Sequence, residues 1–293
     1  MKTLVTGASG LLGGVLMKRL GPDAVGVSRR GAGAAGPHRT LDLADSAGVR
    51  RFFEQEAPDL VIHAAAFSDV DGCERDPQQA WTSNALAVKH LAAACAPRRV
   101  PLVHVSTDYV FGTRGKRTPY TEDDAVSPVN IYGLTKLAGE NFARNAPGAI
   151  VRTSWLYGPG NPSNFVNAIT ARLKSEPLVK VLDDQEDSPT SAEDLAEALV
   201  RIGARLTGPS AGEHLGVFQV CNAGSATRLG MTLKMKEMLG VSARVEPYDR
   251  RELKGRVAIR HDYLVMSTAR YENFFKTRLR RWEDALKEYL CAS

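Results

Sequence analysis

Near its start the chain reads Lys2-Thr-Leu-Val-Thr-Gly7-Ala-Ser-Gly10-Leu-Leu-Gly13. Residues 2–6 are a short apolar segment typical of a strand, and apolar side chains then recur at helical spacing, at Leu12, Val15, Leu16 and Leu20. A glycine-rich turn between a first strand and a first helix lets the backbone approach a pyrophosphate at the helix N-terminus. A tight turn with a purely structural role is the alternative. The strand–turn–helix order favours a dinucleotide site.

The second expected strand, residues 24–27, ends at Ser28, Arg29 and Arg30. In an NAD site, an acidic residue about 20 residues after the glycines binds the ribose 2′-hydroxyl. Here the chain offers a hydroxyl and two guanidinium groups instead. Guanidinium groups match phosphate oxygens, so the sequence predicts NADPH rather than NADH. A solvated loop with two basic residues is the alternative.

Strand and helix signals continue to alternate over roughly the first 150 residues, which indicates an α/β fold with a doubly wound parallel sheet. A buried strand is expected at 58–63, and the small residues that follow it, Ala64–Ala66, would allow close approach of a cofactor or merely join strand to loop. Asn84 lies inside a helix expected at 80–96, where it either bridges neighbouring backbone or is exposed. Further strands are expected at 101–105 and 148–153, and further helices at 49–56 and around Tyr132.

A tyrosine and a lysine four residues apart, Tyr132 and Lys136, share one face of that last helix. An ammonium beside a phenol favours the phenolate, so we expect Lys136 to lower the pKa of Tyr132 from its reference value of about 10. Tyr132 would then exchange a proton near neutral pH. Two unrelated surface residues are the alternative for this pair taken by itself.

Composition describes an ordinary soluble globular protein of 293 residues, with 43% hydrophobic and 24% charged residues. The formal charge is +5, but Lys and Arg are scattered, which favours anionic small molecules over nucleic acid. No apolar run approaches a membrane span and no signal peptide is evident, so we expect a cytoplasmic protein. No cluster has metal-ligand spacing. Four cysteines, far apart, suit a reducing compartment: Cys73, Cys95, Cys221 and Cys291.

Three motifs together give a specific resemblance. Ser-Thr-Asp-Tyr-Val-Phe at 106–111, the segment 128–140 around Tyr132 and Lys136, and Arg-Thr-Ser-Trp-Leu-Tyr at 152–157 resemble the dTDP-4-dehydrorhamnose reductase group of the extended short-chain dehydrogenases. The spacing Gly-x-x-Gly-x-x-Gly at residues 7–13 is also the spacing of that family. The resemblance covers most of residues 1–200.

This resemblance implies a reductase of nucleotide-linked sugars with Thr107, Tyr132 and Lys136 as its catalytic trio. It leaves magnesium open, since some members use it, and it leaves a homodimer open. The residues expected at the cofactor are Gly7, Ser9, Gly10, Leu11, Leu12, Gly13, Ser28, Arg29, Arg30, Asp42, Leu43, Ala64, Ala65, Ala66, Asn84, Tyr132 and Lys136. Those expected at the sugar nucleotide are Thr107, Asp108, Ser154, Trp155, Asn164, Phe165 and Arg260.

Residues 1–155 are expected to form the dinucleotide-binding domain, with later returns near 180–205 and 216–223, and residues 156–293 to form most of an interleaved substrate region. A late strand at 218–221 is expected to rejoin the main sheet. Two departures from the family pattern lie in the substrate region. Glu186 and Asp187 replace an aromatic residue and a glycine, and Arg260-His261 replaces an Arg-Pro pair. Extra carboxylates near a nucleotide diphosphate would repel it.

Two other functions remain open from sequence. The first is an epimerase or dehydratase on the same scaffold, although dehydratases of the family carry a carboxylate directly after Thr-Asp, where this chain has Tyr109. The second is a non-catalytic dinucleotide-binding protein, because a related protein serves as a regulatory subunit of methionine adenosyltransferase. The intact trio of Thr107, Tyr132 and Lys136 favours catalysis.

Overall fold

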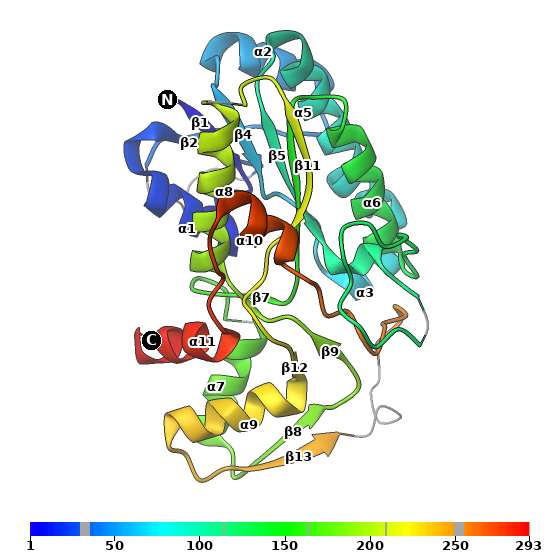
Figure 1. Cartoon of the computed structure of the whole chain (residues 1–293), viewed down its shortest axis with the longest axis vertical. Helices are drawn as coiled ribbons and strands as arrows, with labels where there is room; N and C mark the ends of the chain where they lie inside the picture. The colour runs from blue at the N-terminus through cyan, green and yellow to red at the C-terminus, as the bar shows by residue number, and fades with distance from the viewer. Residues whose placement is uncertain (30–35, 114, 163, 209, 249–254, 293) are drawn as a thin grey trace.

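A seven-stranded parallel sheet forms the centre of the molecule (Figure 1). The computed structural model describes residues 1–29, 36–113, 115–162, 164–208, 210–248 and 255–292. The strand order is β11-β6-β5-β4-β1-β2-β3, which confirms the predicted doubly wound parallel sheet with one late strand added at its edge. The strands are β1 (Thr3–Thr6), β2 (Ala24–Ser28), β3 (His38–Thr40), β4 (Leu60–His63), β5 (Leu102–Thr107), β6 (Gly148–Thr153) and β11 (His214–Gln219).

Neighbouring residues of each central strand point to opposite faces of the sheet, so both faces are apolar. In β1, Leu4 packs into the cluster on one face and Val5 into the cluster on the other. One face is covered by α1 (Leu11–Leu20) and α8 (Ala192–Leu206). The opposite face is covered by α2 (Ser46–Glu56), α5 (Ala87–Cys95) and α6 (Ile131–Ala143).

The single helix expected at 80–96 is interrupted. The chain forms α3 (Val70–Arg75) and α4 (Pro77–Trp81), passes through a π-helical turn, Thr82–Leu86, and continues as α5. Asn84 is fully buried in that turn, where its amide bonds the backbone of Phe67 at both the N–H and the carbonyl. Hydrophobic periodicity cannot distinguish a one-turn π segment from an α-helix, so this turn was not predictable from the residue pattern.

The late strand expected at 218–221 is β11, which starts at His214 and pairs in parallel with β6. A second, smaller layer lies below the sheet in Figure 1. Its core joins Tyr157, Ile169, Met235 and Trp282. It contains α7 (Phe165–Ser175), α9 (Arg228–Leu239), α11 (Trp282–Ala292) and three two-stranded sheets: β7 (Leu156–Tyr157) with β10 (Thr190–Ser191), β8 (Leu178–Leu182) with β13 (Arg244–Tyr248), and β9 (Glu186–Asp187) with β12 (Ala226–Thr227).

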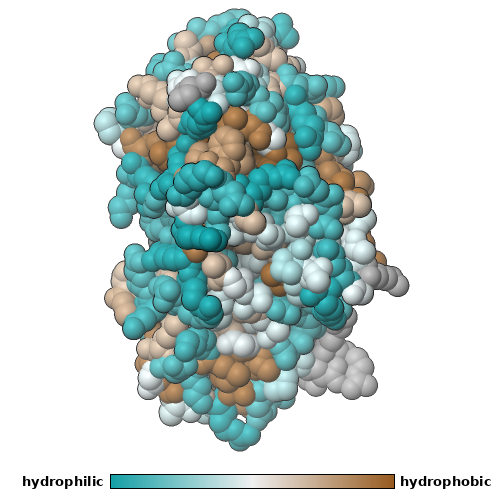
Figure 2. All heavy atoms as spheres, viewed as in Figure 1, coloured by the Kyte–Doolittle hydropathy of each residue, from teal (hydrophilic) through white to brown (hydrophobic). Residues whose placement is uncertain are grey.

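Residues 192–206 return to the central sheet as α8, whereas β8 pairs outside it with β13. The short helix α10 (Ala269–Phe275) packs against β11 at the sheet edge, where Tyr271 and Phe275 contact Phe218. Polar residues dominate the face shown in Figure 2, and apolar residues form small separate patches. None of the helices in the described part of the chain has the length and apolar character needed to span a bilayer.

Candidate active site

A cavity of about 770 Å³ lies at the carboxyl-terminal ends of the central strands. Open parallel sheets bind their ligands in this crevice, beside the point where the strand order reverses. The wall runs from the glycine turn before α1 to the smaller layer, and so brings most of the predicted residues together. Those that line it are Gly7, Ser9, Gly10, Leu11, Leu12, Gly13, Ser28, Arg29, Asp42, Leu43, Ala64, Ala65, Ala66, Thr107, Asp108, Tyr132, Lys136, Ser154, Trp155, Asn164 and Arg260.

Two of the described predicted residues, Asn84 and Phe165, are not in this wall, and a third predicted residue, Arg30, lies outside the described residues. Asn84 is buried behind the wall and fixes the Phe67 backbone, which does line the cavity, so its contribution is to position that loop. Phe165 stacks on Trp155 from behind, with ring centroids 5.5 Å apart. Asn84 and Phe165 therefore contact residues that line the cavity, and their direct contact with a ligand stays a prediction.

The glycine turn has the geometry of a phosphate cradle. Gly7 has φ +71°, and a Cβ there would lie 2.8 Å from the backbone of Ala65. A Cβ on Gly13 would lie 2.0 Å from the carbonyl oxygen of Gly7, so α1 can pack this closely only without a side chain. Gly10 caps α1 without a side-chain hydrogen bond, and the first turn of α1 has no acidic residue. Free N–H groups and a positive helix end therefore fit a dinucleotide pyrophosphate.

The far end of the cavity wall contains Ser28, the last residue of β2, and Arg29, which follows it. The Arg29 side chain is exposed, and the Ser28 hydroxyl is hydrogen-bonded to Nε2 of His38 at 2.9 Å. Sequence reasoning missed His38, because the residue comes from the next strand, β3. A hydroxyl and a guanidinium group at this place fit a ribose 2′-phosphate.

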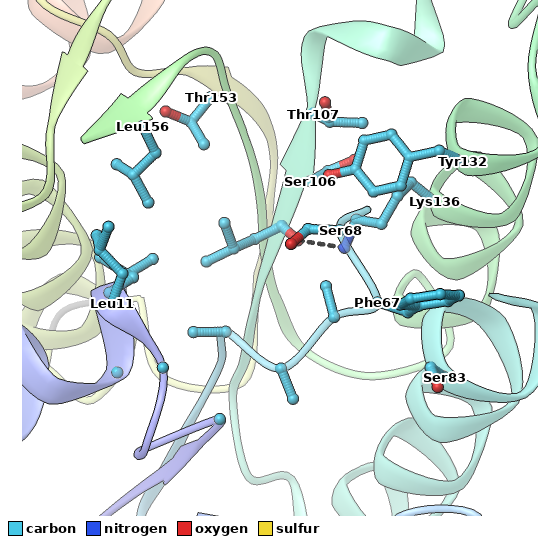
Figure 3. A pocket seen from close by; sticks show the side chains of 18 of the residues that line it. Leu11, Phe67, Ser68, Ser83, Ser106, Thr107, Tyr132, Lys136, Thr153 and Leu156 are labelled. Carbon is cyan, nitrogen blue, oxygen red and sulfur yellow. Dashed lines mark hydrogen bonds between the residues drawn. The ribbon is translucent and has the colours of Figure 1, made fainter. Parts of the chain in front are cut away.

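Tyr132 and Lys136 project from α6 toward the end of β5, which carries Ser106 and Thr107 (Figure 3). The N-cap Asn130 starts the helix by accepting a hydrogen bond from the Gly133 N–H at 2.8 Å. A Cβ on Gly133 would lie 2.1 Å from the Tyr109 carbonyl oxygen, so the glycine lets α6 approach the segment after β5. The predicted trio thus meets at one point of the cavity.

The pKa values in this trio differ from the sequence-based expectation. Burial raises the pKa of Tyr132 far above its ordinary value, an effect that the neighbouring Thr107 hydroxyl opposes. The Lys136 ammonium group donates a hydrogen bond to the Val105 carbonyl oxygen at 2.7 Å, and burial lowers the pKa of Lys136 to about 8. The predicted net fall in the pKa of Tyr132 was therefore wrong, because desolvation of the phenol outweighs the effect of Lys136, whose ammonium group is hydrogen-bonded to the Val105 carbonyl. Tyr132 holds its proton at neutral pH, as a proton donor must.

Asp108 is buried beneath Thr107 and accepts two short hydrogen bonds. Thr107 donates to Oδ1 at 2.8 Å and Ser154 donates to Oδ2 at 2.6 Å. Burial raises the pKa of Asp108 to about 6, although both hydrogen bonds oppose the shift. The carboxylate therefore fixes the Thr107 hydroxyl at the edge of the cavity.

On the substrate side, Arg260 lies against the short helix α3. Its guanidinium forms an ion pair with Asp71 at 2.7 Å, and Asp71 also accepts hydrogen bonds from the Val257 and Ala258 N–H groups. These bonds lower the pKa of Asp71 well below its ordinary value. Sequence reasoning missed Tyr109 and Arg228, which also line the cavity. Tyr109 directly follows a predicted site residue, whereas no local pattern marks Arg228.

Among the residues that the structure describes, no group of three or more His, Cys, Asp and Glu is placed to hold a metal ion. The expectation of magnesium, which rested on resemblance alone, gains no support from the donor set.

Comparison with known proteins gives a consistent picture. The family model for the RmlD substrate binding domain matches residues 1–293. A dTDP-4-dehydrorhamnose reductase from Mycolicibacterium smegmatis is 36% identical over 301 residues, covering 99% of this chain and 85% of the relative. One from Streptomyces griseus is 38% identical over 290 residues, covering 97% and 91%. The crystal structure of the Bacillus anthracis dTDP-4-dehydrorhamnose reductase in complex with NADP is similar with a TM-score of 0.86, 28% identity and full coverage of both chains.

Proposed function

Because the chain belongs to the RmlD family, the dTDP-4-dehydrorhamnose reductase group of the extended short-chain dehydrogenases, we propose that it uses NADPH to reduce the 4-keto group of a nucleotide-linked 6-deoxy sugar, with Tyr132 as the proton donor. The chain is an NAD(P)-dependent oxidoreductase, and reduction of a keto group in a sugar nucleotide fits its relatives. The observation that supports the finer proposal is a protonated phenol, a cationic lysine and a fixed hydroxyl in one cavity with a phosphate cradle.

Each residue has a separate task in this reaction. The bound nicotinamide supplies a hydride to the carbonyl carbon. Tyr132 gives its phenolic proton to the carbonyl oxygen as negative charge develops there. Thr107 has a single hydroxyl proton, which Asp108 accepts in this structure, and in the proposed reaction the hydroxyl turns that proton from Asp108 to the same oxygen. The positive charge of Lys136 stabilises the phenolate that Tyr132 becomes. The large rise in the pKa of Tyr132 on burial makes that stabilisation necessary.

The alternatives account for fewer of these features. A dehydratase needs a carboxylate at the position of Tyr109, whose ring packs edge-on against Tyr132 with centroids 5.6 Å apart. A regulatory subunit would need the dinucleotide cradle but no proton donor, and the relatives are named as reductases. We also propose that residues 156–293 are mainly the substrate-binding region, apart from α8, which packs on the central sheet, and β11, which is a strand of it.

The direct test is a screen of NADPH oxidation against a panel of 4-keto nucleotide sugars, followed by identification of the product. We expect oxidation with a 4-keto-6-deoxy sugar linked to a nucleoside diphosphate. Absence of oxidation across the panel by protein that binds NADPH would contradict the proposal.

The first prediction concerns cofactor choice. NADPH should bind about tenfold or more tightly than NADH, because a charge-assisted contact from a guanidinium to the 2′-phosphate contributes on the order of 1.5–3 kcal/mol. Fluorescence titration of both cofactors measures the ratio. Changing Arg29 and Arg30 together to alanine should abolish the preference. Arg39→Ala on the neighbouring β3 is the matched control, since that side chain pairs with Glu56 at 3.0 Å. Equal affinities in the parent protein would refute this assignment.

The second prediction concerns pH. Lys136 loses its charge as the pH rises through about 8, and Asp108 gains a proton as the pH falls through about 6. A protonated Asp108 can no longer accept from both Thr107 and Ser154, so kcat/KM should fall on both sides of this window. Asp108→Asn should remove the acidic limb and leave the basic limb. An unchanged acidic limb in that variant would assign it to another group.

A further inference from the structure

Arg228 enters the cavity from the first residue of α9, on the side of the smaller layer. Its guanidinium carbon lies 5.3 Å from the ring centroid of Phe165 and 5.6 Å from that of Trp155, and these two rings stack on each other. Contacts with two aromatic rings hold a guanidinium in place but leave its N–H donors unused. The two rings therefore hold the guanidinium, while Asp187 and Asp184 act on its charge from beyond salt-bridge distance.

Unlike the nearby Arg256 and Arg260, Arg228 forms no ion pair with a described carboxylate. Arg256 pairs with Asp184 and Arg260 pairs with Asp71, each at 2.7 Å. Across the described ranges, Arg228 has no carboxylate within 4.0 Å, and its buried Nε has no hydrogen-bond partner. Leaving a buried donor of a charged group unpaired is costly, which indicates a site built for an anionic ligand.

The acidic residues at 184–187 repel an anion at Arg228 less than their charges alone would suggest. Asp184 is neutralised by Arg256, and Glu186 accepts a hydrogen bond from Ser225 at 2.6 Å. Asp187 is buried, and its desolvation together with the nearby Asp108 raises the pKa of Asp187 well above its ordinary value, although Arg228 opposes the shift. The repulsion expected from the sequence is therefore reduced for an anion in front of Arg228.

If the reacting carbonyl of a substrate lies at Tyr132, Arg228 is placed to contact the opposite end of that substrate. Tyr109 packs against Tyr132, and Tyr109 in turn lies near Arg228, which enters the cavity from α9 and not from the glycine turn before α1. The phosphates of a dinucleotide would lie at the opposite end, against Gly7–Gly13. A second anionic group, one sugar ring from the reacting carbonyl, is what a nucleoside diphosphate sugar presents.

We propose that Arg228, held over Trp155 and Phe165, is the residue that binds the diphosphate of the sugar nucleotide. The inference rests on the proposed function for the class of substrate. It adds that the chain recognises the diphosphate through a guanidinium whose donors are otherwise unused, with Arg260 already engaged by Asp71.

The test is calorimetric titration of dTDP and thymidine into the full chain saturated with NADPH. Arg228→Gln should weaken dTDP about 10- to 100-fold and leave thymidine and NADPH unchanged, because a charge-assisted bidentate contact is lost. Lys234→Gln is the matched control, since it removes the same charge from an exposed position on the same helix, where Lys234 pairs with Glu237. If Arg228→Gln fails to bind NADPH, Arg228→Met, which keeps the aliphatic stem over the rings, replaces it in the same comparison.

The outcomes separate this inference from the proposed reaction. Unchanged dTDP affinity in the Arg228 variant, with NADPH binding intact, overturns the inference even if the parent protein is an active reductase. Loss of NADPH affinity in step with dTDP affinity in both Arg228→Gln and Arg228→Met overturns it too, because it would assign Arg228 to the cofactor or to the fold. Loss of dTDP affinity alone supports the site, whether or not any 4-keto sugar is reduced.

Discussion

Tyr132→Phe should lower kcat by about 10²- to 10⁴-fold, the usual contribution of general acid catalysis, while NADPH affinity stays unchanged. Phenylalanine keeps the ring and its edge-on packing against Tyr109 but removes the phenolic proton. The burial that raises the pKa of Tyr132 keeps that proton in place until the carbonyl oxygen becomes basic enough to take it. Steady-state kinetics with the preferred sugar nucleotide, together with an NADPH titration, measures both quantities.

Tyr120→Phe is the matched control for this change. Tyr120 is also a buried tyrosine, but it stacks on Phe111 away from the cavity wall and donates to the Thr113 carbonyl. The control should be active at close to the parent rate. Parent-like turnover by Tyr132→Phe would show that Tyr132 is not the donor and would favour a non-catalytic use of the dinucleotide site.

Lys136→Met should reduce both turnover and cofactor affinity. An ammonium group has three donors, and the Val105 carbonyl takes one of them, which leaves donors for a ligand in the cavity that Lys136 lines. In the proposed reaction its charge also stabilises the Tyr132 phenolate. Removing a preorganised charge of this kind costs about 10²- to 10³-fold in kcat. We expect the Michaelis constant for NADPH to rise in the same variant.

The two effects of Lys136→Met distinguish it from Tyr132→Phe, which should change turnover alone. Lys89→Met on α5 is a suitable control, because Lys89 is exposed and lies over the Phe142 ring. A Lys136→Met variant with normal NADPH affinity and reduced turnover would show that Lys136 does not bind the cofactor and acts only through its charge. Normal turnover would remove it from the mechanism.

Sequence was sufficient to predict the central sheet. The glycine turn before α1, the apolar runs of β1, β4, β5 and β6, and the Tyr132–Lys136 pair on α6 are each determined by local physics: glycine without a Cβ, β-branched apolar runs, and helical spacing. The late strand β11 was expected to rejoin the sheet, and it does so beside β6. The segment that forms β11 is short but strongly apolar, which is why this strand was predictable.

The properties of the site that depend on long-range packing were not predictable in the same way. The pKa of Tyr132 depends on burial by α6 packing, which no spacing reveals, so the expected direction of the shift was wrong. The role of Asn84 depends on the Phe67 loop, 17 residues away in sequence. Arg228 meets Trp155 and Phe165 only because the smaller layer brings α9 beside α7.

The most direct test of the central claim is transfer of deuterium from NADPH carrying deuterium at both C4 positions to a dTDP-linked 4-keto-6-deoxy sugar. The account predicts that one deuterium appears at sugar C4 in the reduced product, at a rate that Tyr132→Phe lowers by about 10²- to 10⁴-fold. A product without deuterium at C4, or oxidised cofactor without a reduced sugar, would contradict it.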